Sequence, residues 1–195
     1  MNTKNLLFLI AIIMLSFSFS ACGEYGKVDQ GRVIAFENDK VTVIEDKNME
    51  PKNPDYSILP PHTYTMPTDP NERGANPKAG LRLKIDVDKK YIKIFNTQTQ
   101  AIEDLPIEIV DVQKSIGGDH PLVAGKEFPV VDKEKRQVTI YSPRQKMLST
   151  FTVPEEYIDW PEYTWEAGDE VRIYWKEKGV SLRFMNITKT DIFKR

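Results

Sequence analysis

Short runs in which apolar and polar residues alternate fill most of the chain after Gly31, and they limit what it can fold into. A period of two places successive side chains on opposite faces of a β-strand. The expected strands are 33–36, 41–44, 81–87, 92–94, 107–112, 138–141, 149–153, 171–175 and 182–187. No stretch keeps the i, i+3, i+4, i+7 spacing of an amphipathic helix over three turns, and only a single helical turn is expected near 154–157. The sequence therefore predicts an all-β fold.

Three segments of the first half recur in the same order in the second half. Residues 31–43 resemble 125–140, residues 63–67 resemble 150–154, and Ala79-Gly80 with the strand after it resembles Ala167-Gly168 with its own strand. Part of this likeness is expected of any two hairpins rich in Val, Thr and Ile. The preserved order and spacing nevertheless favour an internal duplication.

A repeat of four to six short strands leaves unpaired edges unless its sheet closes. We therefore expect two tandem β-barrel-like repeats of OB or SH3 size, with one larger barrel or sandwich built from both copies as the alternative. The expected division is a signal peptide at 1–21, a tether at 22–30, a first repeat at 31–116, a linker at 117–124 and a second repeat at 125–195. Seven of the 13 prolines fall in 51–80. Because proline lacks an amide donor, we expect a long loop there, with only 63–66 extended.

The N-terminus has the features of an export signal. Lys4 precedes 14 uncharged residues, LLFLIAIIMLSFSF at 6–19. As a helix this run would be about 21 Å long, and it is too short to span a hydrocarbon core of about 30 Å. A positive start, a short apolar run and small residues at its end are typical of a secretory signal peptide, here a signal helix that is removed.

The run ends Phe19-Ser20-Ala21-Cys22, which resembles the lipobox of bacterial lipoproteins, with Phe19 in place of the usual Leu. The resemblance implies cleavage before Cys22, a thioether-linked lipid on its sulfur, acylation (palmitate) of the new amine and a membrane anchor. Ordinary cleavage after Ser20 is the alternative, but it would leave the only cysteine of the chain as an unpaired exported thiol. Gly23 lacks the Asp that often retains such proteins at the inner membrane, so the resemblance favours the periplasm-facing outer membrane.

Composition and motifs exclude several classes of function. The formal net charge is −2 and no basic stripe is present, so nucleic acid is not an expected partner. The two histidines, His62 and His120, lie far apart in the sequence. Motifs for metalloproteases, serine hydrolases, P-loops and covalent haem are absent. We therefore expect no enzymatic activity, no cofactor and no metal.

Two segments could still bind a ligand. Tyr157, Trp160, Tyr163 and Trp165 lie within nine residues, amid several carboxylates, and could stack on a sugar or meet a cationic protein. The alternative is that these aromatic side chains close one end of the second repeat. Asp119 and His120 could offer two metal ligands, although the preceding Gly117-Gly118 makes a simple turn between repeats the preferred interpretation.

The leading hypothesis is thus a lipid-anchored cell-envelope protein that binds another envelope protein without catalysis. The second hypothesis is a small-ligand, carbohydrate or metal-binding lipoprotein, with the aromatic segment or His120 as contacts. A third is hydrolysis of envelope polymers by paired acids such as Glu155 and Glu162, which would need a separation of about 5 to 10 Å across a cleft.

Overall fold

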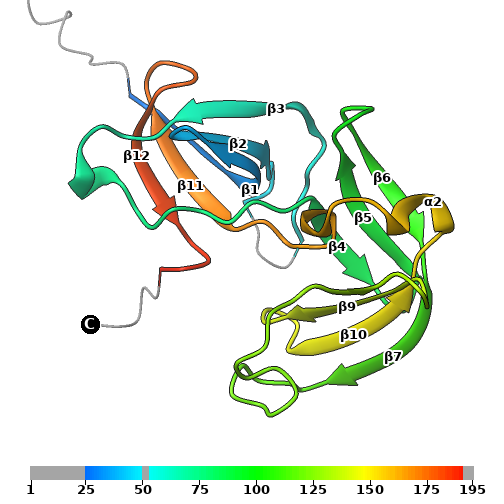
Figure 1. Ribbon diagram of the computed structural model, residues 1–195. Helices are drawn as coiled ribbons and strands as arrows, with labels where there is room; N and C mark the ends of the chain where they lie inside the picture. Colours follow the sequence, from blue (N-terminus) through cyan, green and yellow to red (C-terminus); the bar gives the residue numbers. More distant parts are fainter. Residues whose placement is uncertain (1–24, 50–52, 191–195) are drawn as a thin grey trace, which may run out of the picture.

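The computed structural model describes residues 25–49 and 53–190; the expected signal peptide and Cys22 lie outside them. Its elements are β1 (Lys27–Glu37), β2 (Lys40–Glu45), β3 (Ile58–Thr65), η1 (Pro70–Glu72), β4 (Arg82–Asp86), β5 (Tyr91–Asn96), β6 (Ala101–Pro106), β7 (Glu108–Lys114), β8 (Val130–Asp132), β9 (Gln137–Ser142), β10 (Met147–Thr152), α2 (Glu155–Ile158), η2 (Glu162–Thr164), β11 (Glu170–Trp175) and β12 (Ser181–Asn186). The predicted all-β fold is confirmed, and so is the helical turn, which is α2. The strands form two lobes (Figure 1).

Lobe 1 is a curled five-stranded antiparallel sheet in the order β12-β11-β1-β2-β3. Its inward side chains form one core: Val33, Val41, Val43, Tyr64, Met66, Val171, Ile173 and Phe184. The two edges of the sheet approach each other but do not pair as strands. The amide of Thr65 donates to the carbonyl of Gly179 at 2.9 Å, and the amide of Gly74 donates to the carbonyl of Phe184 at 2.9 Å. Lobe 1 is therefore an open sheet, not a closed barrel.

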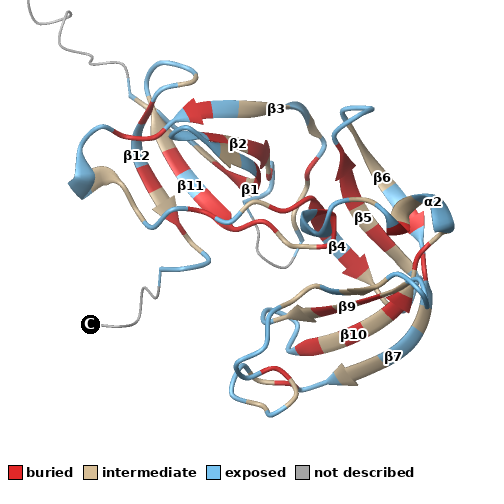
Figure 2. Cartoon of the chain, in the orientation of Figure 1, coloured by how far each residue is buried: buried red, intermediate tan, exposed pale blue. Residues whose placement is uncertain are grey.

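Lobe 2 packs the three-stranded sheet β4-β5-β6 against the four-stranded sheet β7-β10-β9-β8. Their facing side chains share a larger core: Ile85, Ile92, Ile94, Leu105, Ile107, Val138, Ile140, Met147, Phe151, Val153, Ile158 and Trp165. Figure 2 shows buried residues along the inner faces of these strands and exposed residues in the connecting turns. A third cluster, formed by Ile34, Ile44, Tyr56, Leu81, Leu83 and Phe95, lies between the two lobes.

The expected tandem order of two closed repeats is wrong. Lobe 1 combines β1, β2 and β3 from the first half with β11 and β12 from the second, and lobe 2 combines β4, β5, β6 and β7 with β8, β9 and β10. The pairing of β1 with β11 joins residues as distant in the sequence as Lys27 and Trp175. Residues 117–124, expected to link two repeats, instead form turns between β7 and β8 within lobe 2. Strands of the first half pair with strands of the second half. This pairing satisfies backbone groups that closure of each repeat was expected to satisfy.

Hydrogen-bond register supports the predicted duplication of the β2–β3 and β9–β10 segments. The hydroxyls of Thr42 and Thr63 lie 3.0 Å apart across β2 and β3, and those of Thr139 and Thr150 lie 2.9 Å apart across β9 and β10. After each pair, the next segment also repeats: the amide of Met66 donates to the carbonyl of Asp39 at 2.8 Å, and that of Val153 donates to Arg136 at 3.1 Å. Asp39 and Arg136 both have positive φ, 58° and 53°. The two halves thus share a hairpin with the same register.

The duplicated Ala-Gly pairs meet at the point where the chain crosses between lobes. Leu81 forms an antiparallel bridge with Ala167. A Cβ added at Gly80 would lie 2.6 Å from the amide nitrogen of Gly168, and one added at Gly168 would overlap the carbonyl oxygen of Val33. The first crossing carries the chain from lobe 1 into β4, and the second carries it from lobe 2 into β11. Glycine is required at both positions because the backbones approach too closely for a side chain.

Two smaller expectations also need correction. The proline-rich segment holds a full strand, β3, which begins at Ile58 and includes Pro60 and Pro61. This is possible because β3 is an edge strand, where a missing amide donor leaves no partner unsatisfied. In addition, β1 begins at Lys27, inside the range expected for the tether.

Candidate functional site

A group of ionisable side chains lies inside lobe 1, at the end where β1 begins. Asp29, Glu45 and His62 come from β1, β2 and β3, which are neighbours in the sheet. Asp29 has the same parity along β1 as the core residue Val33, and Glu45 has the same parity along β2 as Val43. Val43 in turn pairs with His62. Strand alternation therefore turns all three polar side chains toward the interior of the lobe, and each is partly buried.

The three side chains converge. One ligand atom from each of Asp29, Glu45 and His62 can be chosen so that all lie within 4.8 Å of one another. His62 Nδ1 lies 3.6 Å from Glu45 Oε2, which is too long for a hydrogen bond. This nitrogen is buried and has no hydrogen-bond partner. An unsatisfied buried nitrogen facing two carboxylates is a feature that packing alone does not explain.

Two aromatic side chains fix the Asp29 carboxylate. Its Oδ2 accepts a hydrogen bond from the Tyr64 hydroxyl and another, of 2.9 Å, from Trp175 Nε1. Tyr64 comes from β3 and Trp175 from β11, so both halves of the chain position this one side chain. The His62 and Tyr64 rings also meet edge to face, with centroids 6.4 Å apart. Tyr64 and Trp175 therefore hold the Asp29 carboxylate, and the Tyr64 ring also contacts the His62 ring.

The electrostatics of the site reflect its burial. Desolvation raises the pKa of the Glu45 carboxyl, and the nearby charge of Asp29 raises it further, while His62 and Lys178 act in the opposite direction. Burial also raises the pKa of the Tyr64 hydroxyl, and the hydrogen bond to Asp29 adds to this effect. Both pKa shifts arise first from the burial of these groups.

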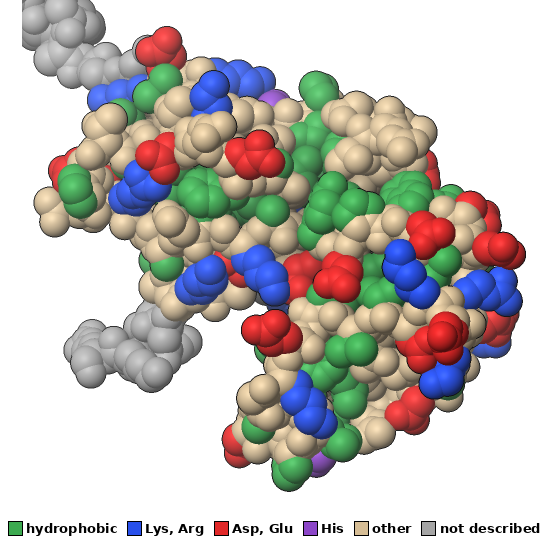
Figure 3. Space-filling view, viewed as in Figure 1, with side chains coloured by type: hydrophobic (Ala, Val, Ile, Leu, Met, Phe, Trp, Pro, Cys, Tyr) green, Lys and Arg blue, Asp and Glu red, His purple; other side chains and the backbone are tan. Residues whose placement is uncertain are grey.

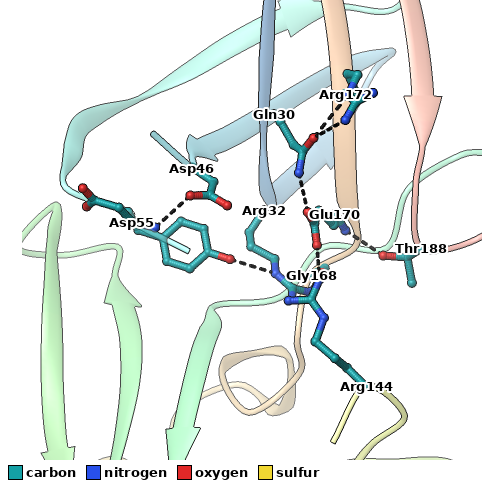
Figure 4. Close-up of polar contacts among 10 residues, drawn as sticks. Gln30, Arg32, Asp46, Asp55, Arg144, Gly168, Glu170, Arg172 and Thr188 are labelled. Carbon is teal, nitrogen blue, oxygen red and sulfur yellow. Dashed lines mark hydrogen bonds and ion pairs between the residues drawn. The ribbon is translucent and has the colours of Figure 1, made fainter. Parts of the chain in front are cut away.

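A second polar group joins the two lobes (Figure 4). Glu170 in β11 accepts hydrogen bonds from Gln30 Nε2, at 2.6 Å, and from Arg144, which lies in the turn between β9 and β10 of lobe 2. Arg172 donates to Gln30 Oε1 at 2.8 Å, and the backbone amide of Glu170 donates to the Thr188 hydroxyl at 2.8 Å. Both carboxylate oxygens of Glu170 thus accept a hydrogen bond. Because Arg144 belongs to lobe 2 and Glu170 to lobe 1, the network connects the lobes.

Other contacts in the same view brace the β1–β2 end of this junction. Arg32 donates to the Tyr56 hydroxyl at 3.1 Å and to the Gly168 carbonyl at 2.8 Å. Asp46 accepts the backbone amide of Asp55 at 2.7 Å. Burial raises the pKa of the Tyr56 hydroxyl, and Arg32 opposes that rise. These groups are satisfied by the chain itself.

A cleft of about 520 Å³ lies between the lobes. Its lining residues are Lys78, Ala79, Lys126, Glu127, Phe128, Pro129, Glu162, Tyr163 and Glu166. Charges of both signs gather around the notch between the lobes in the space-filling view (Figure 3). Lys78 and Glu166 pair across part of it, at 2.9 Å. Tyr163 is therefore the one member of the predicted aromatic group that reaches this cleft, and it is 45% exposed.

The other members of the aromatic group pack into lobe 2. Trp165 has no exposed surface and belongs to the core, where its ring lies 6.5 Å from that of Phe151. Tyr157 and Trp160 are partly buried against the same core, and their rings meet 4.9 Å apart. The alternative, in which these side chains close one end of a second repeat, does not apply as stated, because the core they pack into belongs to lobe 2 and combines strands from both halves.

Asp119 and His120 lie in the turns between β7 and β8. His120 Nδ1 accepts the backbone amide of Leu122 at 3.2 Å, and its own amide donates to the carbonyl of Gly117 at 3.1 Å. Within 25–49 and 53–190, the one group of three potential metal ligands is Asp29, Glu45 and His62, and it includes neither Asp119 nor His120.

Sequence reasoning missed the site in lobe 1, although a signal for it was present. Glu45 continues the inward parity of Val41 and Val43, and Asp29 precedes Val33 with the same parity. A charged residue at an inward position is unusual, and here two occur at matching ends of adjacent strands. What the sequence lacked was the pairing of β3 with β2, which brings His62 to them.

A family model of a domain of unknown function, DUF4881, matches residues 24–195. The chain belongs to the DUF4881 family. The matched range spans both lobes and includes every strand of each. No curated protein and no solved structure matches the chain. Among the described residues of this DUF4881 domain, no helix has the length and apolar character needed to cross a bilayer.

Proposed function

We propose that this protein is a non-catalytic module of the bacterial cell envelope, held by lipid on Cys22 at the periplasmic face of the outer membrane, where it binds another envelope protein. The lipobox-like sequence Phe19-Ser20-Ala21-Cys22 carries this proposal. Only residues 23–26 separate Cys22 from β1, which begins at Lys27. The five steps from Cys22 to Lys27 reach at most about 18 Å, so an anchored lobe 1 would lie close to the lipid surface.

Lobe 2 offers a surface for the partner. In the sheet β7-β10-β9-β8, Phe151 and Val138 face the core. Alternation therefore places Thr139 and Thr150 on the opposite face. The turns after β7 cover part of this face, because Tyr141, which has the same parity as Thr139, packs its ring 6.1 Å from that of Phe128. Val130 on the edge strand β8 pairs with Thr139 and is 52% exposed. The row Val130–Thr139–Thr150 is uncharged and ends at Asp111 of β7, which pairs with Thr150. Three uncharged side chains beside a single carboxylate favour a protein partner over an ionic ligand.

Photo-crosslinking in intact cells tests the proposal. A photoreactive amino acid at Thr150 should give an adduct with one protein of the membrane fraction, and Thr150→Lys should weaken recovery of that protein with the otherwise unmodified chain. The matched control places the same photoreactive group at Glu177, which is exposed in the turn between β11 and β12 of lobe 1 and should give no such adduct.

The anchor is tested in the same cells. Cys22→Ser should release the chain from the membrane fraction and remove the acyl mass from its N-terminus. The proposal fails if the serine variant still pellets with membranes, or if Thr150 and Glu177 give the same adducts.

A further inference from the structure

The group formed by Asp29, Glu45 and His62 has no role in the function proposed above. We propose that it is a binding site for one divalent transition-metal cation, with the His62 imidazole and the two carboxylates as ligands. The three side chains come from adjacent strands, and their ligand atoms already lie within 4.8 Å of one another. The site would lie near the start of lobe 1, two residues after β1 begins at Lys27.

The geometry is close to that of a bound cation. Zinc takes imidazole nitrogen at about 2.0–2.1 Å and carboxylate oxygen at about 2.0–2.2 Å, which places tetrahedral ligand atoms about 3.4 Å apart. His62 Nδ1 and Glu45 Oε2 are already 3.6 Å apart. Asp29 also offers an oxygen that lies within 4.8 Å of one ligand atom of His62 and of one ligand atom of Glu45, so small side-chain rotations would complete the arrangement.

The environment of His62 Nδ1 supports a metal ligand, although the nitrogen also lies within ion-pair distance of Glu45 Oε2, at 3.6 Å. His62 Nδ1 is buried and makes no hydrogen bond. A metal binds the lone pair of an imidazole nitrogen, and Nδ1 offers that lone pair when the ring proton is on Nε2. A cation between His62 and Glu45 would satisfy both atoms at once and would offset the repulsion between Glu45 and Asp29.

The surroundings of Asp29 resemble an outer ligand shell. One carboxylate oxygen, Oδ2, accepts hydrogen bonds from Tyr64 and Trp175. Within the part of the chain that the structure describes, Oδ1 accepts none, and so it can face a cation. Hydrogen bonds to the outer oxygen of a ligating carboxylate fix its orientation and are a regular feature of metal sites.

The ligand set also indicates which metals would bind. Imidazole favours zinc and its first-row neighbours, whereas magnesium and calcium prefer sites made of oxygen alone. Three protein ligands leave a fourth tetrahedral position for water or for a group from a partner. Zinc is therefore the probe of choice, and calcium is the contrasting ion.

Isothermal titration of the full chain in detergent tests the proposal. The protein carries no affinity tag and is first stripped with EDTA. We expect zinc to bind with one-to-one stoichiometry and calcium to bind at least about 100-fold more weakly. His62→Gln should lower zinc affinity by more than about 100-fold, and Tyr64→Phe, which removes only a hydrogen bond to Asp29, by about 10- to 100-fold.

His120→Gln is the matched control, because it removes the only other histidine and leaves the site intact. Its zinc affinity should equal that of the unaltered chain. Circular dichroism establishes that each variant is folded, and Glu45→Gln replaces His62→Gln if the latter does not fold. The proposal is overturned if the unaltered folded chain binds no zinc, if the site variants bind it as tightly as the unaltered chain, or if His120→Gln loses affinity to the same degree.

Discussion

Gly168→Ala should strongly destabilise the protein. Gly168 lies where the two segments that connect the lobes cross each other. The added methyl group would overlap the carbonyl oxygen of Val33, which belongs to the backbone and cannot rotate away. Separating the segments breaks hydrogen bonds that meet there. The amide of Val33 donates to Asp169 at 3.0 Å, and the amide of Gly80 donates to the carbonyl of Val33 at 3.1 Å.

The expected loss can be estimated from these contacts. Each of the two hydrogen bonds contributes about 0.5–1.5 kcal/mol net, and forcing a methyl group into a packed position costs about 1–3 kcal/mol. The free energy of unfolding should therefore fall by about 2–6 kcal/mol, out of a typical total of about 5–15 kcal/mol. For a chain of this size, each kcal/mol lowers Tm by about 2–4 °C, which gives a decrease of about 4–24 °C.

Thermal and urea unfolding followed by circular dichroism measure this change. Gly118→Ala is the matched control, since a Cβ at Gly118 meets nothing within 4 Å and its φ lies outside the left-handed region. The control should leave Tm unchanged or raise it slightly, because alanine restricts the unfolded chain. If Gly168→Ala unfolds within about 2 °C of the control, the backbones do not cross as closely as described and the reasoning is refuted.

Two further predictions concern the core of lobe 2 and the acid sensitivity of lobe 1. Phe151→Ala should lower the free energy of unfolding by about 3–5 kcal/mol, since Phe151 is fully buried, and should change the fluorescence of the neighbouring Trp165; unchanged urea unfolding would contradict this. The hydrogen bond from Arg73 holds the pKa of the Asp39 carboxyl below its usual value. A lowered carboxyl pKa stabilises the folded state above the unfolded value of 3.8 and ceases to do so as pH falls through the folded value. Exchange of the Gly74 amide, corrected for its intrinsic rate, should therefore accelerate in acid. Arg73→Gln should weaken that dependence and leave the part due to Glu72, whose pKa is lowered by its hydrogen bond from Arg183; equal pH dependence in both proteins would count against it.

The strands were predictable where burial on one face is regular. Leu83 and Ile85 in β4 alternate with exposed or charged positions, and the pattern locates the strand to within a residue or two. The beginning of β3 was not predictable in the same way, because Pro60 and Pro61 argue against a strand unless it is known to lie at an edge. Edge position is a property of the assembled sheet, so no local pattern records it.

The way in which strands of the two halves combine in each lobe was not predictable from periodicity either. The duplicated hairpins and Ala-Gly pairs were visible in the sequence, but a repeat can close on itself or exchange strands with its copy while burying the same side chains. The choice depends on pairs such as Arg32 with Glu170, which no local pattern connects. The sequence shows that Gly80 and Gly168 occupy equivalent places in the repeat. Only the structure shows that their backbones approach each other at one crossing.

The exchange has a consequence for the site in lobe 1. Its three proposed ligands come from the first half of the chain, whereas Trp175, which fixes Asp29, comes from the second half. The lobe 1 core likewise needs Val171 and Phe184 to cover the strands that carry the ligands. Neither half could therefore form the site alone, because the first half would lack the β11 partner of β1. The interlobe hydrogen bond from Arg144 reaches Glu170 at the start of the same β11, so lobe 2 also contacts the strand that holds Trp175 against Asp29.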